Sequence, residues 1–166
     1  MGPDDLSTLE VIAEIALGLA GFSGLLLVLS EPNEALKQTE RFRLTTLIYS
    51  GFGTLFLALL PLALFGGPWA DATVWLGLGI LLSLYTLVGL AVLPAASIRL
   101  HRDHPDLFPW RLICSQVTIH ICSLILALSV LFRWTEYPLN GYLLALVLLL
   151  VHGAVAFVRM LFYRRE

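Results

Sequence analysis

Two carboxylic acids interrupt the first apolar run of the chain. Glu10 and Glu14 are one helical turn apart, and Gly18 and Gly21 continue the same face of a helix with about 100° per residue. An acidic side chain near the middle of a membrane helix costs about 3 kcal/mol, so it usually pairs inside a bundle or borders a polar pathway. Rings of Glu side chains around an axis concentrate and select cations. The spacing therefore indicates a cation pathway, with Glu10 and Glu14 as its charged groups.

Hydroxyl side chains in the second apolar run extend this hypothesis. Thr46 and Ser50 lie four residues apart, which places them on one face of a helix. They either continue the pathway begun by the acids or bond to their own helix, as hydroxyls in apolar helices often do. The predicted pathway residues are Glu10, Glu14, Gly18, Gly21, Thr46 and Ser50.

A second set of polar groups falls within the last two apolar runs. Gln116 and His120 share one helical face in the fourth run, and His152 and Arg159 share a face in the fifth. Three interpretations stay open. They are a proton relay, because imidazoles titrate near neutral pH, a hydrogen-bonded structural core, and axial ligation of a haem b by His120 and His152. Since no second histidine pair accompanies these two, we expect no cofactor.

The sequence offers little support for enzymatic catalysis. It contains no G-x-S-x-G, H-E-x-x-H, C-x-x-C or phosphate-loop motif. His101, Asp103 and His104 could ligate a metal, but an arginine lies among them and no second ligand cluster follows, so no metal site is predicted. A net charge of −2, with no basic patch beyond the ends of the apolar runs, argues against nucleic-acid binding. We expect a protein that is not an enzyme and has no catalytic residues.

Composition identifies the elements that must position these groups. Of the 166 residues, 58% are hydrophobic and 13% are charged, whereas soluble domains average about 45–50% apolar and about 25% charged residues. Five apolar runs are long enough to cross a bilayer core, which takes roughly 20 residues of helix. They are Thr8–Leu29, Leu44–Phe65, Thr73–Ile98, Leu112–Phe132 and Leu139–Phe162. Because no linker or repeat divides the chain, we predict one all-α transmembrane domain over residues 1–166.

Basic residues predict the orientation of the five spans. Nine of the ten Lys and Arg residues fall in the first and third connections and at the C-terminal end, and only Arg133 falls elsewhere. Lys and Arg accumulate on the cytoplasmic side of membrane proteins, which predicts an external N-terminus and an internal C-terminus. Trp and Tyr favour the boundary between membrane and water. We therefore expect an outer set of aromatic residues at one boundary and an inner set at the other: Trp69, Trp75, Trp134, Tyr137 and Tyr142 outside, and Trp110 and Tyr163 inside.

Small residues in the first run predict close helix packing. Ala16, Ala20 and Gly24 form a row at four-residue spacing, and such rows let helix backbones approach closely. We therefore expect helix one to be central, with several neighbours, and the chain to form a homo-oligomer in the lipid bilayer. These patterns favour an oligomeric, cation-favouring pore. The alternative is a non-conducting accessory subunit that binds a membrane protein partner, and a third hypothesis is a haem b electron carrier.

Three short segments carry a resemblance to a known group of proteins. They are residues 13–24 (AEIALGLAGFSG), 40–44 (ERFRL) and 157–162 (FVRMLF). On these segments the chain resembles a family of short, uncharacterised bacterial inner-membrane proteins that open with an AEIA-x-x-LAGFSG helix. The resemblance implies a multi-pass protein of the bacterial plasma membrane, and it implies no activity.

Overall fold

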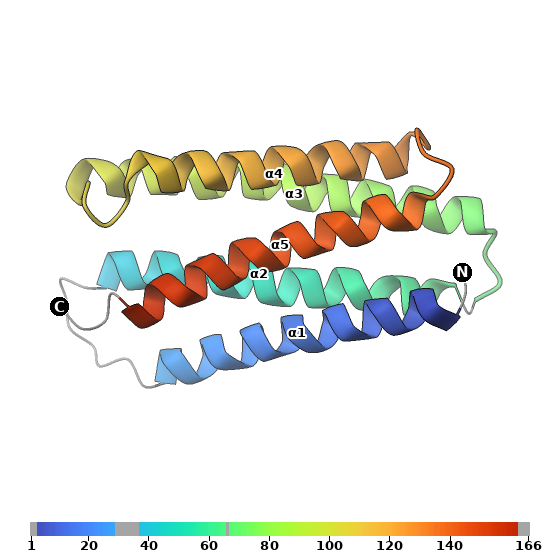
Figure 1. Ribbon diagram of the computed structural model, residues 1–166, viewed down its shortest axis with the longest axis horizontal. Helices are drawn as coiled ribbons and strands as arrows, with labels where there is room; N and C mark the ends of the chain where they lie inside the picture. The colour runs from blue at the N-terminus through green and yellow to red at the C-terminus, as the bar shows by residue number, and fades with distance from the viewer. Residues whose placement is uncertain (1–2, 29–36, 66, 163–166) are drawn as a thin grey trace.

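The described part of the chain folds into five α-helices (Figure 1). The computed structural model describes residues 3–28, 37–65 and 67–162. The helices are α1 (Pro3–Val28), α2 (Lys37–Leu64), α3 (Asp71–Asp103), α4 (Trp110–Leu131) and α5 (Pro138–Phe162). Each contains a segment that is long and apolar enough to cross a membrane. The prediction of five such helices is confirmed, and the chain is a candidate multi-pass membrane protein.

Two helices extend well beyond the apolar runs that predicted them. α2 begins at Lys37 rather than Leu44, and α3 continues past Ile98 to Asp103. The added turns carry charged residues, which end an apolar run but retain the backbone hydrogen bonds of a helix. Hydropathy therefore locates the part of each helix that can lie in lipid, and the hydrogen-bonded helix is longer.

The helices pack as two pairs joined by α5. α1 packs along α2, and α3 packs along α4, and these are the most extensive contacts of the bundle. α5 lies between the pairs, where it contacts α4 and α2 and, less extensively, α1 (Figure 1). α2 also meets α3 in a smaller contact. The expectation that helix one is central is therefore wrong within one copy: α1 lies at the edge because only one of its sides meets other helices.

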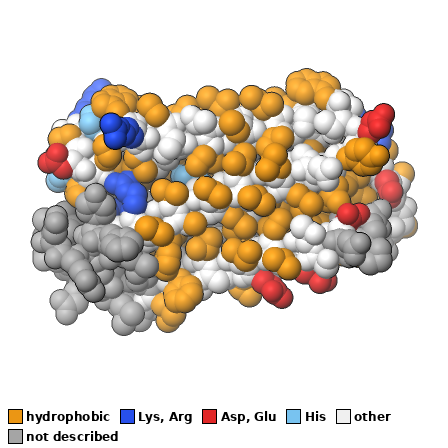
Figure 2. Space-filling model, viewed as in Figure 1, with side chains coloured by type: hydrophobic (Ala, Val, Ile, Leu, Met, Phe, Trp, Pro, Cys, Tyr) orange, Lys and Arg blue, Asp and Glu red, His pale blue; other side chains and the backbone are white. Residues whose placement is uncertain are grey.

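The two ends of the bundle differ in charge (Figure 2). One end holds the α3–α4 connection, the start of α2 and the end of α5, and we call it the basic end. Its exposed arginines include Arg41, Arg99, Arg102 and Arg111. The opposite end, which we call the acidic end, holds the start of α1 and exposes Asp71 and Glu136 on its connections and helix starts.

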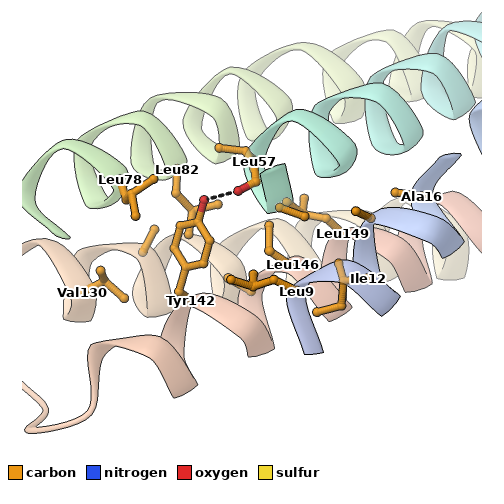
Figure 3. Close-up of a cluster of buried hydrophobic side chains, with 14 of the residues drawn as sticks. Leu9, Ile12, Ala16, Leu57, Leu78, Leu82, Val130, Tyr142, Leu146 and Leu149 are labelled. Carbon is orange, nitrogen blue, oxygen red and sulfur yellow. Dashed lines mark hydrogen bonds between the residues drawn. The ribbon is translucent and has the colours of Figure 1, made fainter. Parts of the chain in front are cut away.

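An apolar core fills the half of the bundle nearer the acidic end (Figure 3). All five helices contribute to it, with buried residues that include Leu9, Ile12, Ala16, Leu57, Leu78, Leu82, Val130, Leu146 and Leu149. In a lipid environment such a core is held by close van der Waals packing rather than by exclusion of water. Leucine side chains therefore close the interior of this half.

Two aromatic side chains belong to this core. Tyr142 is fully buried, and its hydroxyl donates a 2.6 Å hydrogen bond to the backbone carbonyl of Leu57 (Figure 3). Trp75 is also buried and contacts the Tyr142 ring edge to face. Both rings lie in the first two turns of their helices, at the acidic end, and they face the interior of the bundle.

Candidate functional site

The acid–glycine face of α1 lies on the outside of the bundle. This face consists of Glu10, Glu14, Gly18 and Gly21, all of which are exposed. A Cβ atom added at Gly18 or Gly21 would meet nothing within 4 Å. Within the described residues, the face therefore contacts no other helix. In a membrane it meets lipid or another protein surface.

Two members of the small-residue row on α1, Ala16 and Ala20, make a different contact, whereas Gly24 of the same row is exposed. Ala16 and Ala20 are buried, and the Ala20 backbone lies 3.1–3.2 Å from where a Cβ at Gly51 of α2 would be. Such an approach requires small residues on both helices. Gly51 lies near the middle of α2. Glu14 precedes Ala20 by six residues, so it lies about 9 Å from the middle of the bundle toward the acidic end.

Two histidines meet in the interior at the middle of the bundle. The rings of His120 and His152 touch edge to face with 4.8 Å between centroids, and the side chains are 0% and 2% exposed. The hydroxyl of Ser50 lies 3.1 Å from Nδ1 of His152. The Nε2 atoms of both rings have no hydrogen-bond partner among the described residues. Buried polar atoms without partners lower stability, so the pair is a candidate for function as well as for packing.

His120 is held by its own helix. Its Nδ1 lies 2.9 Å from the backbone carbonyl of Gln116. Because a carbonyl oxygen only accepts, Nδ1 carries the hydrogen, and Nε2 of the neutral ring is a bare acceptor. The side-chain carbonyl of Gln116 accepts a 2.8 Å hydrogen bond from Ser97 of α3. These bonds fix the orientation of the imidazole and tie α3 to α4 beside it.

Two tyrosines join α2 to α3 next to His120. The Tyr49 hydroxyl donates to the backbone carbonyl of Tyr85, the Tyr85 hydroxyl donates to the carbonyl of Tyr49, and the rings stack at 4.3 Å. The Tyr85 hydroxyl lies against Gly53, which follows Tyr49 by four residues on α2. The Tyr49 hydroxyl lies against Gly89, which follows Tyr85 by four residues on α3. A Cβ at Gly53 would overlap the Tyr85 hydroxyl, and one at Gly89 would overlap the Tyr49 hydroxyl. Glycine is therefore required at both positions for this reciprocal pair, which we call the tyrosine clasp.

The geometry at the histidine pair does not fit a haem. A porphyrin held by two axial imidazoles lies between the rings, whereas the rings of His120 and His152 touch each other directly. The residues described by the structure also contain no group of three or more His, Cys, Asp or Glu side chains that could hold a metal ion. The site can instead accept a hydrogen bond or a proton at Nε2 of His120. Nε2 of His152 accepts if its Nδ1 donates to Ser50, and it donates if its Nδ1 accepts from Ser50.

A pocket reaches from the basic end to His152, between α2, α4 and α5. Its lining residues are Phe42, Arg43, Thr46, Phe108, Leu112, Ser115, Gln116, Ile119, His152, Val155, Ala156 and Arg159. The enclosed volume is about 20 Å³, which accommodates about one water molecule. The guanidinium carbons of Arg43 and Arg159 lie 6.0 and 5.6 Å from the centre of the Phe108 ring. Arg159 also donates to the backbone carbonyl of Leu107.

The structure separates the residues that the sequence singled out into two groups. One group lies in the interior and the pocket, and it consists of Thr46, Ser50, Gln116, His120, His152 and Arg159. The other is the acid–glycine face, on the exterior of α1. The Thr46 hydroxyl bonds to the backbone carbonyl of Phe42 on its own helix. A single copy therefore does not join all six predicted pathway residues into one route.

The tyrosine clasp was missed from the sequence. Its signal is a Tyr-x-x-x-Gly spacing that occurs in two consecutive spans, at residues 49–53 and 85–89.

Comparisons of the chain with protein-family models, with curated proteins and with solved structures find no match.

Proposed function

We propose that this protein is an oligomeric, cation-favouring pore of the bacterial plasma membrane, lined by the acid–glycine faces of α1 from several copies. The observation that carries the proposal is the exposure of Glu10 and Glu14 on a helix that is apolar enough to span the membrane. Carboxylates are unfavourable in hydrocarbon. Copies that turn these faces toward a shared axis would place the acids in water, where rings of Glu attract cations.

The packing inside one copy supports a path between copies rather than through one. The half of the bundle nearer the acidic end is closed by leucine and tyrosine side chains of its apolar core. Among the described residues of this half, an ion crossing inside a copy would meet scattered hydroxyls, such as those of Thr54, Ser123 and Tyr142, and no buried charged side chain. The α1 face carries the charged groups that such a path needs.

The orientation belongs to the same proposal. The basic end would face the cytoplasm, because arginines accumulate on that side of membrane proteins. Glu10 would then lie nearer the external surface than Glu14 by about 6 Å, which is the rise of four helical residues. A ring of Glu10 carboxylates would gather cations, and Glu14 would select them deeper in the path.

Ion flux in liposomes tests the proposal. Glu14→Gln should lower cation flux and the cation-to-anion permeability ratio at least about threefold, because one ring of charge is removed. The matched control is Glu136→Gln, which removes an exposed carboxylate from the α4–α5 connection at the same end. If Glu14→Gln conducts with wild-type selectivity, α1 does not line the path.

A non-conducting accessory subunit is the second candidate. It is supported by the open surface at Gly18, Gly21 and Gly24, where added Cβ atoms would meet nothing within 4 Å. A surface of small residues suits close packing of a partner helix as well as it suits a pore. Absence of flux under voltage, tension and a pH gradient, together with stoichiometric co-purification of a second membrane protein, would favour this candidate.

A further inference from the structure

One ring nitrogen of His152 is buried without a partner in the middle of the bundle. The side chain is 2% exposed, and its Nδ1 lies 3.1 Å from the hydroxyl of Ser50. Its Nε2 makes no hydrogen bond to any residue that the structure describes. Buried polar atoms lower stability unless they are hydrogen-bonded, and ordered water molecules bond to many of those that the protein leaves unpaired. Nε2 of His152 is therefore a candidate partner for water.

The pocket that reaches His152 from the basic end has room and partners for one water molecule. Its enclosed volume is about 20 Å³, and a buried water requires about two to four polar partners. Gln116 accepts from Ser97 through its carbonyl oxygen, so its amide N–H groups are donors at the wall. The Thr46 hydroxyl, which donates to its own helix, retains lone pairs that accept. Together with Nε2 of His152, these groups supply the required partners.

His120 provides an internal comparison at the same depth. It is fully buried, its ring touches that of His152, and its Nε2 also has no partner among the described residues. His120 does not line the pocket, however. A Cβ added at Gly89 would lie 2.6 Å from Nε2 of His120, so the backbone of α3 lies against this atom. Of the two rings, only that of His152 borders the pocket.

The pocket leads from the histidine pair toward the basic end. It lies between α2, α4 and α5, and Ser115 on its wall is exposed. The half of the bundle nearer the acidic end is occupied by the apolar core. We propose that the pocket holds ordered water that hydrogen-bonds to Nε2 of His152 and connects this ring to the water at the basic end. In heavy water the N–H bond of the ring then becomes an N–D bond, and the proton leaves into the solvent.

Solid-state NMR of the full-length protein in liposomes, with ¹⁵N-labelled histidine, tests the proposal. Magnetisation that starts on water should reach the ring nitrogens of His152. After transfer to heavy water, the ring N–H signal of His152 should decay at least about tenfold faster than that of His120, because α3 covers the free nitrogen of His120. His104, which is exposed at the basic end, marks the fast limit. Backbone correlations assign the rings, so this comparison requires no variant.

A matched pair of variants on α4 tests the route. Ser115→Phe places an aromatic ring at the wall of the pocket, and it should slow exchange at His152 at least about fivefold. Thr118→Phe adds the same ring at an exposed position of α4 that does not line the pocket. It should change the exchange rate less than about twofold.

Three results would overturn the proposal. Absence of magnetisation transfer from water to His152, or equal exchange rates at His120 and His152, would show that the pocket does not bring water to this ring. Wild-type exchange in Ser115→Phe would show that water reaches the ring by another route. None of these results depends on whether the protein conducts ions.

Discussion

Substitution of Gly89 by alanine should break the tyrosine clasp at a single point. The new Cβ would overlap the Tyr49 hydroxyl and would lie 2.6 Å from Cδ2 and Nε2 of His120. Neither neighbour can move easily, because the Tyr49 ring is stacked on Tyr85 and His120 is fully buried. The Tyr49 hydroxyl must therefore leave the carbonyl of Tyr85.

The expected decrease in the free energy of unfolding follows from two effects. Overpacking a well-packed site costs about 1–3 kcal/mol, and loss of the Tyr49 hydrogen bond adds about 1 kcal/mol. The net decrease in the free energy of unfolding is about 2–4 kcal/mol. At about 2–4 °C per kcal/mol for a chain of this length, the unfolding temperature should fall by roughly 4–16 °C.

The assay is thermal unfolding in detergent, followed by circular dichroism. Gly77→Ala is the matched control on the same helix, because its Cβ would meet nothing within 4 Å, and it should be neutral or up to about 1 kcal/mol more stable. Adding Tyr49→Phe to Gly89→Ala removes the overlapping oxygen, so it should recover part of the loss. Equal stability of the Gly89 and Gly77 variants would refute the clasp as a packing constraint.

Three further predictions concern single groups. Tyr142→Phe should lower the free energy of unfolding by about 1 kcal/mol in the same assay, because it removes the buried bond to Leu57. Ser50→Ala should cost about 1–2 kcal/mol, because Nδ1 of His152 loses its partner. Cys122, exposed near the middle of α4, should react in liposomes with a neutral maleimide and resist a charged thiosulfonate, because lipid covers that surface.

Each of these three predictions would be contradicted by a specific result. Wild-type stability of either hydroxyl variant would mean that the bond it removes is not formed in the membrane-embedded protein. Rapid modification of Cys122 by the charged reagent would place water, rather than lipid, on that side of α4.

The candidate site was predictable in its residue types and only partly in its arrangement. Mid-span positions identify His120 and His152 as polar groups that an apolar helix must bury, and their contact at 4.8 Å agrees with that interpretation. Their relation to the acids was not predictable. Glu14 faces away from the histidines, because Ala16 and Ala20 occupy the side of α1 that packs on the bundle.

By itself, the sequence determined five helices that are long and apolar enough to span a membrane, and the charge difference between their ends. Both follow from the composition of short stretches of sequence, since about 20 apolar residues cross a bilayer and arginines gather where the apolar runs stop. Only the tertiary structure decided which face of each helix is covered. Tyr142 faces the core and bonds to Leu57, and α1 lies at the edge rather than at the centre. The physical reason is that burial depends on which backbones can approach, and that depends on residues such as Gly51 and Gly89 meeting partners far away in the chain.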